Sequence, residues 1–329
     1  MLFSPEREIA SACGDQRLAE SLINTASAAR LPNEFTIMKT RFALAAFFLA
    51  FLPPTNAALD PAKIEELTGL KGKQTENVFK VSAPRDDVKI AVDGMPMAPF
   101  LGLTSWAAFT ETKPGSAMVM GDIVLFQDEV NPVMSAAFEA GLAVTALHNH
   151  FFFDQPKVLF MHIGGEGELE KLARGVRAVF DKTKAIRTRN PTPADTFANE
   201  RWPERSSISP APIESILGNG ESKDGMFKVT IGRTTSMHGM QADKDMGVNT
   251  WAAFFGTDGD AGVDGDFAVA EDELQPVLKS LRAASINIVA IHQHMTHEQP
   301  RMMFLHYWGR GKATALANAV KAALGLTKP

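Results

Sequence analysis

The sequence is almost without cysteine: Cys13 is the single one among 329 residues. A disulfide framework, a thiolate zinc cluster and an iron–sulfur centre each need several thiolates and are therefore excluded. An excess of positive charge is missing too, because 33 Lys and Arg stand against 38 Asp and Glu, for a net charge of -5. A dedicated nucleic-acid-binding protein needs a basic face that displaces counterions, so the sequence does not favour this class.

Several catalytic signatures and a long apolar segment are also missing. The sequence has no G-x-S-x-G nucleophile elbow, no phosphate-binding P-loop and no G-x-G-x-x-G after a strand-like run. Its main apolar run, Phe42 to Leu52, has eleven residues. A membrane-spanning helix needs about 20, so we expect no membrane span.

The apolar run instead forms the centre of a secretory signal peptide. Lys39 and Arg41 give a positive region before it, and the letters "PPTNA" after it supply a helix break and small residues. This order of charge, apolar run and cleavage site is typical of signal peptides. We therefore expect residues 38–57 to be a signal peptide.

This interpretation defines the mature protein. Met38 would be the true start, and residues 1–37 an upstream over-extension of the reading frame. Cleavage near Ala57 would remove Cys13 and release the product into the periplasm or the medium. No cysteine follows the apolar run, so a lipid anchor is not indicated.

The remainder of the chain repeats itself. "GDIVLFQDEVNPV" (121–133) returns as "GDFAVAEDELQPV" (265–277), 144 residues later. At the same offset, residues 121–180 align with 265–324 without a gap, and 20 of the 60 positions are identical. An internal repeat of this kind indicates two related modules. We place module one at 59–187, a linker rich in Pro and Ser at 188–210, and module two at 211–329.

Each module combines several β-like runs with helices. Residues Val130 to Ala140 have apolar side chains at helical spacing, and Gly141 can end that helix. "LAVTALHNH" and "KVLFMHI" are strand-like, and "GELEKLARGVRAVFD" is an amphipathic helix. The order predicts an α+β fold, in which each module is a mostly antiparallel sheet with helices on one face.

The strongest chemical signal is a repeated histidine pattern. H-x-H-x11-H occurs once in each module, and the six residues are His148, His150, His162, His292, His294 and His306. Two histidines at i and i+2 lie on one face of a strand, about 6.6 Å apart. If the following turn centres on Gln155, residue numbers of opposed pairs sum to 310, which sets His162 directly across from His148. The same rule pairs His306 with His292.

Three converging imidazoles with an open fourth position are typical of a catalytic Zn²⁺ site. Both copies keep all three histidines although two thirds of the aligned positions differ. Two alternatives remain open: structural, hydrogen-bonded histidines, and acid–base chemistry without a metal. Copper is a further possibility, because module two adds thioethers and imidazoles in Met295, Met302, Met303, His238 and His297.

Matched carboxylates supply candidates for proton transfer or a fourth ligand. We select Glu129, Glu273 and Glu298 as candidate catalytic residues. Glu129 and Glu273 are favoured because a helix start can point at a sheet face, and Glu298, matched by Asp154, adjoins the Gln-Pro shared by both modules. Asp122 and Asp266 are weighed as ligands or second-sphere partners. The alternatives are helix N-terminal acids for Glu129 and Glu273, turn residues for Asp154 and Glu298, and a strand bend at the two Gly-Asp pairs.

These motifs carry a resemblance. "MVMGDIVLFQDEVNPVM" and "VTALHNH", with "GDFAVAEDELQPVL" and "IHQHM" in module two, resemble the LppY/LpqO-type family of secreted bacterial proteins and lipoproteins of unassigned function. The resemblance covers nearly all of 59–329 and implies export, but it implies no activity. The histidine spacing alone is similar to that of acetolactate decarboxylase and related zinc proteins, by analogy.

Three functions compete at this point. The first is a periplasmic metalloenzyme, a hydrolase or a lyase, that acts on a small-molecule substrate. The second is a protein that binds a metal or small ligand without turnover, and the third is a structural envelope protein whose histidines only stabilise the hairpin. Module two has the additional His297 and Glu298, which favours it slightly as the working module.

Overall fold

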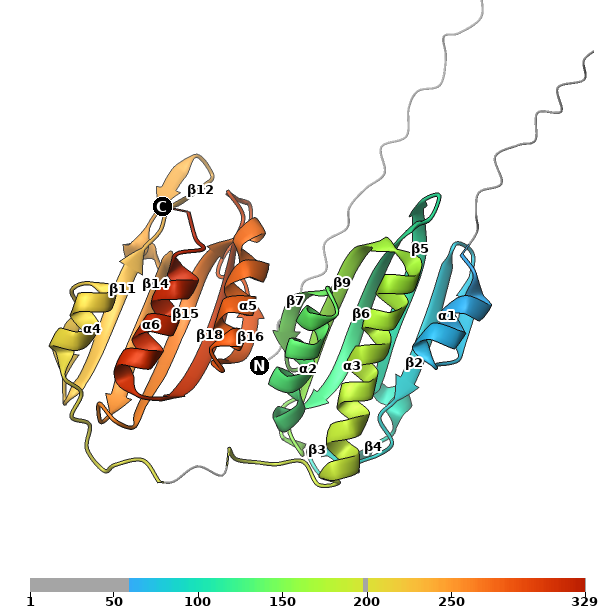
Figure 1. Ribbon diagram of the computed structural model, residues 1–329, viewed down its shortest axis with the longest axis horizontal. Helices are drawn as coiled ribbons and strands as arrows, with labels where there is room; N and C mark the ends of the chain where they lie inside the picture. Colours follow the sequence, from blue (N-terminus) through green and yellow to red (C-terminus); the bar gives the residue numbers. More distant parts are fainter. Residues whose placement is uncertain (1–58, 198–200, 329) are drawn as a thin grey trace, which may run out of the picture. The chain divides into compact units, whose positions relative to one another are not determined.

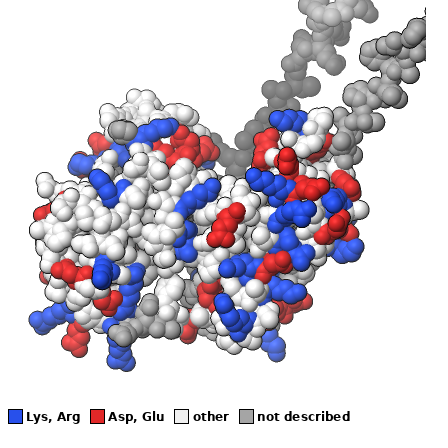
Figure 2. All heavy atoms as spheres, viewed as in Figure 1, with Lys and Arg blue, Asp and Glu red and all other residues white. Residues whose placement is uncertain are grey.

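The computed structural model describes residues 59–197 and 201–328. The predicted upstream extension (1–37) and signal peptide (38–57) lie outside the described residues and stay predictions. Among the described residues no helix is both long and apolar enough to cross a membrane. In this part of the chain, positive and negative side chains are interspersed over the face drawn in Figure 2.

Module one begins and ends with a helix. Its elements in chain order are α1 (Pro61–Thr68), β1 (Gly72–Thr75), β2 (Val78–Pro84), β3 (Ile90–Val92), β4 (Met95–Met97), η1 (Pro99–Leu101), β5 (Thr104–Lys113), β6 (Ser116–Phe126), α2 (Gln127–Glu139), β7 (Ala143–His148), β8 (Asp154–Gln155), β9 (Val158–Glu168) and α3 (Leu169–Arg189).

Module two repeats this order. Its elements are α4 (Pro210–Leu217), β10 (Glu221–Lys223), β11 (Met226–Gly232), β12 (Thr235–Met237), β13 (Met240–Ala242), η2 (Lys244–Met246), β14 (Asn249–Gly256), β15 (Ala261–Ala270), η3 (Glu271–Glu273), α5 (Leu274–Ala283), β16 (Asn287–His292), β17 (Glu298–Gln299), β18 (Met302–Gly311) and α6 (Ala313–Leu324).

The long strands of both modules form one twelve-stranded sheet. Its order is β1-β2-β5-β6-β9-β7-β16-β18-β15-β14-β11-β10, so the second half mirrors the first. Neighbouring long strands are antiparallel, and β7 meets β16 through the pair Leu147 and Ile291. Helices α2 and α3 cover one face of the module-one strands, and α5 and α6 cover module two in the same way (Figure 1). The predicted α+β fold with tandem modules is confirmed.

Helix α2 shows why these residues form a helix here. Its buried side chains include Val130, Val133, Met134 and Ala137, which recur at helical spacing and face the sheet. The helix begins at Gln127, three residues before the predicted start, and its chain turns away at Gly141, whose φ of 80° suits glycine. The main hydrophobic core lies between the helices and the sheet.

The opposite face of the sheet is covered only in part. In module one the three-stranded sheet β4-β3-β8 lies over Val124, Phe126 and Phe160, and in module two β13-β12-β17 lies over Ala268, Met302 and Phe304. Each small sheet lies at one end of the long strands of its own module (Figure 1). The adjoining strand positions on this face carry polar side chains, and the predicted site lies there.

Each module donates and accepts a matching pair of side-chain-to-backbone hydrogen bonds with the other module. The Asn131 amide accepts from the Ile288 backbone N–H at 2.8 Å and donates to its carbonyl at 3.2 Å. Gln275, 144 residues after Asn131, does the same with Val144 at 3.0 and 2.7 Å. Val144 and Ile288 flank strand irregularities. A bulge frees backbone groups from the ladder, so the side-chain amide of the opposite module satisfies them.

Candidate metal centre

Four side chains of module two come together on the sheet face opposite the helices. Asp266 lies on β15 and pairs directly with His306 on β18. His292 ends β16 and pairs with Phe304, two positions before His306, so period-two alternation puts His292 on the same face. His294 follows β16 in a loop, and its ring stacks on Phe304 at 3.5 Å between centroids.

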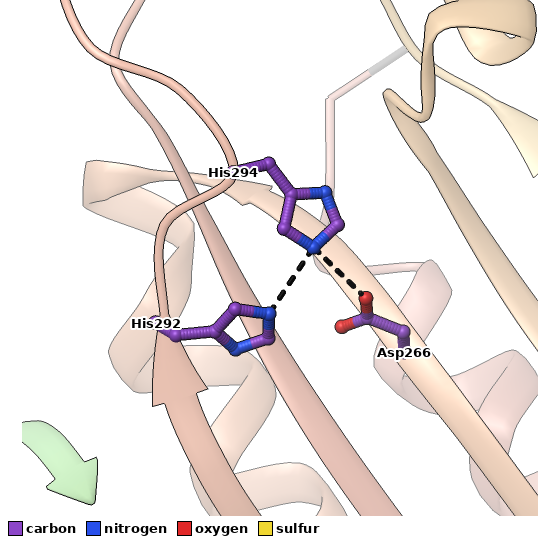
Figure 3. Close-up of side chains that lie close together, drawn as sticks. All are labelled: Asp266, His292 and His294. Atoms are coloured by element: carbon purple, nitrogen blue, oxygen red, sulfur yellow. Dashed lines mark hydrogen bonds and ion pairs between the residues drawn. The ribbon is translucent and has the colours of Figure 1, made fainter. Parts of the chain in front are cut away.

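Asp266, His292 and His294 each offer a ligand atom, and these atoms lie within 4.8 Å of one another. The Nε2 atoms of His292 and His294 are 3.1 Å apart, and His294 Nε2 is 3.5 Å from Asp266 Oδ2 (Figure 3). Two nitrogens bound to one tetrahedral ion at 2.0–2.1 Å would be about 3.3–3.4 Å apart. This group of three could therefore hold a metal ion. The His306 ring stacks on His292 at 4.8 Å and is the nearest further imidazole.

The electrostatics of the cluster suit a cation. Burial, with His306 and His294 beside it, lowers the pKa of His292 to about 4, so its imidazole is neutral at pH 7, the form that binds metals. Burial raises the pKa of the Asp266 carboxyl, and His306 and His294 oppose that rise. Asp266 Oδ1 and His292 Nδ1 are buried atoms without a hydrogen-bond partner among the described residues. Such atoms are costly unless a ligand satisfies them.

Module one brings the equivalent four residues together. The Nε2 atoms of His148 and His162 are 3.1 Å apart, and His162 Nε2 lies 3.9 Å from Asp122 Oδ1. The His150 ring is 5.1 Å from His148 and stacks on Phe160 at 3.3 Å. Burial and the neighbouring His148 lower the pKa of His150. All six predicted histidines thus lie in two clusters, each with an aspartate; that they bind metal stays a prediction.

The predicted strand register is wrong by two residues. His148 faces Phe160, and His162 faces Ala146 instead of His148. In module two His292 likewise faces Phe304. The tight turn assumed around Gln155 is replaced by a short strand, β8, in which Gln155 pairs with Ala91 of β3. A shift of two residues keeps every side chain on its face, so the imidazoles still converge diagonally.

Glu129 and Glu273, predicted as candidate catalytic residues, lie in ion pairs at the starts of helices. Glu129 is fully buried and accepts from Arg85 Nη1 at 2.7 Å and from the Phe126 backbone N–H at 2.9 Å. Arg187 Nε lies 2.7 Å from the other oxygen. None of these described contacts involves a histidine. Glu129 is thus an acid that stabilises the start of helix α2, as the alternative interpretation of the sequence stated, and its contacts do not include the imidazoles.

Glu273 repeats the arrangement in module two. It pairs with Arg233 and accepts from the backbone N–H groups of Ala270 and Lys328 at 2.8 and 2.7 Å. Burial favours the neutral carboxyl, but Arg233 and these donors outweigh it and lower the pKa of Glu273. Glu273 therefore anchors the start of a helix, and the expectation that it points at the histidine face is corrected.

Glu298, the third candidate catalytic residue, stabilises a turn. It is buried, and its Oε1 accepts from the Met302 backbone N–H at 3.0 Å. Its counterpart Asp154 accepts from Val158 N–H at 2.6 Å and from Lys157 at 2.9 Å. Each carboxylate lies on a short strand, β17 or β8, and accepts from the first backbone N–H of the long strand that follows. Both residues therefore stabilise the bend between two strands, which is close to the turn alternative.

The methionines that suggested copper lie in or against hydrophobic cores. Met302 is buried in the satellite core, and Met295 and Met303 pack against cores. The rings of His238 and His297 lie 6.2 Å from each other, and no contact recorded for either ring involves His292 or His294.

The fold and the two clusters define a two-module α+β protein with a candidate metal-binding group of histidine and aspartate. The chain belongs to the family described as Domain of Unknown Function (DUF1259), whose model matches residues 62–182 and 211–326. The two matched segments correspond to the two modules. The resemblance to the LppY/LpqO-type family and the likeness to acetolactate decarboxylase stay predictions from the sequence.

No curated protein matches this chain. Among solved structures, a trimeric bacterial microcompartment shell protein, PduB, is similar at 10% identity and a TM-score of 0.17, covering 78% of this chain and 89% of its own. EtuB from Clostridium kluyveri is similar at 11% identity and a TM-score of 0.20, covering 79% and 90%. TM-scores this low do not establish a shared fold.

Proposed function

We propose that this is an exported protein that binds a divalent metal ion, Zn²⁺, through Asp266, His292 and His294 of module two. One observation carries the proposal: a ligand atom from each of these residues lies within 4.8 Å of the other two. The repetition of the same four positions in module one supports it. Export rests on the sequence of residues 38–57, and the N-terminus of the recovered protein should then fall near Ala58.

The donor set favours zinc among common ions. Imidazole nitrogen with one carboxylate oxygen is a typical zinc set, whereas Ca²⁺ and Mg²⁺ prefer oxygen ligands alone. Cu²⁺ also binds imidazole and is the competing ion. Cu⁺ prefers thioethers, and the methionines that suggested copper, Met295, Met302 and Met303, lie in or against hydrophobic cores.

Three protein ligands leave a fourth position for a substrate, which supports a metal-dependent hydrolase or lyase. A bound zinc would supply Lewis acidity at that position. His294 retains a side-chain exposure of 35%, so the cluster can be reached from solvent. His306, directly across from Asp266, is the group placed to hold or move a proton beside the centre.

A specific observation also supports the second candidate, a metal-binding protein without turnover. With His306 added to Asp266, His292 and His294, the cluster contains four donors, enough to complete a tetrahedral shell. Closed four-ligand shells are typical of structural sites. The role of His306, as ligand or as free base, therefore separates the two functions.

Cobalt substitution distinguishes these functions. We expect protein loaded with Co²⁺ to show visible absorption of a tetrahedral site, and added azide to shift it because an open position accepts the anion. A spectrum that azide does not change would identify a closed shell and a binding protein. Failure to take up cobalt or zinc would contradict both functions and leave the structural alternative.

A further inference from the structure

A cavity of about 400 Å³ adjoins the module-two cluster, and His306 belongs to its wall. Asp264 and Trp308 also line it, each two strand positions from a cluster residue: Asp264 from Asp266, and Trp308 from His306. Residues at i and i+2 lie on one sheet face about 6.6 Å apart. The cavity thus begins one side chain away from the candidate ligands.

The walls of the cavity have the composition of a small-molecule site. Apolar side chains from both modules, including Val130, Leu159 and Val289, line the cavity together with Trp308. The polar groups are few, among them Asp264 and Asn287. Ligand pockets are usually about 300–1,000 Å³ and mostly apolar, with a small number of polar groups that orient the ligand.

The two modules differ at these positions although they agree at the candidate ligands. The residues of module one that correspond to Asp264 and Trp308 are Met120 and Gly164. Module one therefore has neither the carboxylate nor the large aromatic ring next to its cluster. Only module two therefore has a carboxylate and an indole, from Asp264 and Trp308, that could contact an organic ligand beside the cluster.

We infer that this cavity is the substrate pocket of the module-two centre, and that it takes a compact organic molecule with an apolar or aromatic body and an oxygen-bearing head that reaches the metal. The inference rests on the proposed function. Trp308 and the aliphatic walls accommodate the body, and Asp264 accepts a hydrogen bond from the ligand. Asp264 and Asp266 together disfavour an anionic body, because like charges repel.

Two hydroxamic acids test the pocket on zinc-loaded protein. Acetohydroxamic acid carries only the metal-binding head, and benzohydroxamic acid adds a phenyl body. We expect benzohydroxamic acid to bind at least about tenfold more tightly, the factor that burial of an aromatic ring supplies. In Val289→Trp the added indole fills the cavity, and this preference should disappear; Val289 is 49% exposed, so the change avoids the core.

The matched control is Thr145→Trp, the same position in module one, which should keep the wild-type preference. Zinc content is measured in every variant and should not change. If zinc is bound but the two probes bind alike, or Val289→Trp keeps the preference, the pocket is refuted while the proposed function stands. If wild-type protein holds no zinc, the proposed function fails, and this inference fails with it.

Discussion

His292→Ala is expected to weaken zinc binding by at least about a hundredfold, because loss of even a second-sphere partner of a metal ligand costs about 10–100-fold. His292 is the most constrained ligand of the cluster: its Nε2 lies 3.1 Å from that of His294, and burial keeps it neutral. Alanine removes the donor without adding bulk. Competition with a chromophoric chelator measures the zinc affinity of the module-two site.

Two variants make this result specific. His238 is exposed and has a φ of 52°, which asparagine tolerates, so His238→Asn should bind zinc like the wild type. His148→Ala removes the residue of module one that is equivalent to His292, and it should leave the zinc affinity of the module-two site unchanged. Equal affinities of His292→Ala and the wild type would exclude His292 as a ligand.

Glu129→Gln should lower the free energy of unfolding by about 3–5 kcal/mol, the usual effect of removing one partner of a buried ion pair. Glu129 is fully buried between Arg85 and Arg187, which are 6% exposed each. The neutral amide leaves two buried guanidinium groups without this carboxylate. Urea denaturation of both proteins measures the difference.

The same variant tests the assignment of Glu129 to the fold. Zinc affinity of the folded protein should equal that of the wild type, since the described contacts of Glu129 include no histidine. Glu139→Gln, an exposed change at the other end of α2, is the control and should alter stability by less than about 0.5 kcal/mol. If Glu129→Gln kept the wild-type stability but lost zinc binding or turnover, Glu129 would belong to the metal centre and not to the structural ion pair.

The repeat made much of the fold and the site predictable. A constant offset of 144 residues located both modules. Alternation put His148 with His162, and His292 with His306, on one sheet face, whereas His150 and His294, predicted on the same strands, follow them in loops. The convergence survived an error in register, because a shift of two residues changes the neighbour but not the face. His148 and His162 therefore meet although they are not directly opposed.

Longer-range pairings explain what the sequence could not reveal. Asp122 faces His162 because β6 lies beside β9, a neighbourhood that neither strand specifies by itself. The Gly-Asp pair shared by both modules was a usable signal, but a strand bend explained it equally well. Glu129 was selected from its place at a helix start, and its partner Arg85, 44 residues earlier, shows that it anchors that helix.

Anomalous diffraction from crystals of zinc-loaded protein, collected on both sides of the zinc absorption edge, locates the bound metal. We expect a peak in module two within bonding distance, about 2.0–2.2 Å, of His292, His294 and Asp266. A protein that crystallises in excess zinc with no peak between these three side chains, or with zinc only at scattered surface positions, would contradict the proposed metal site.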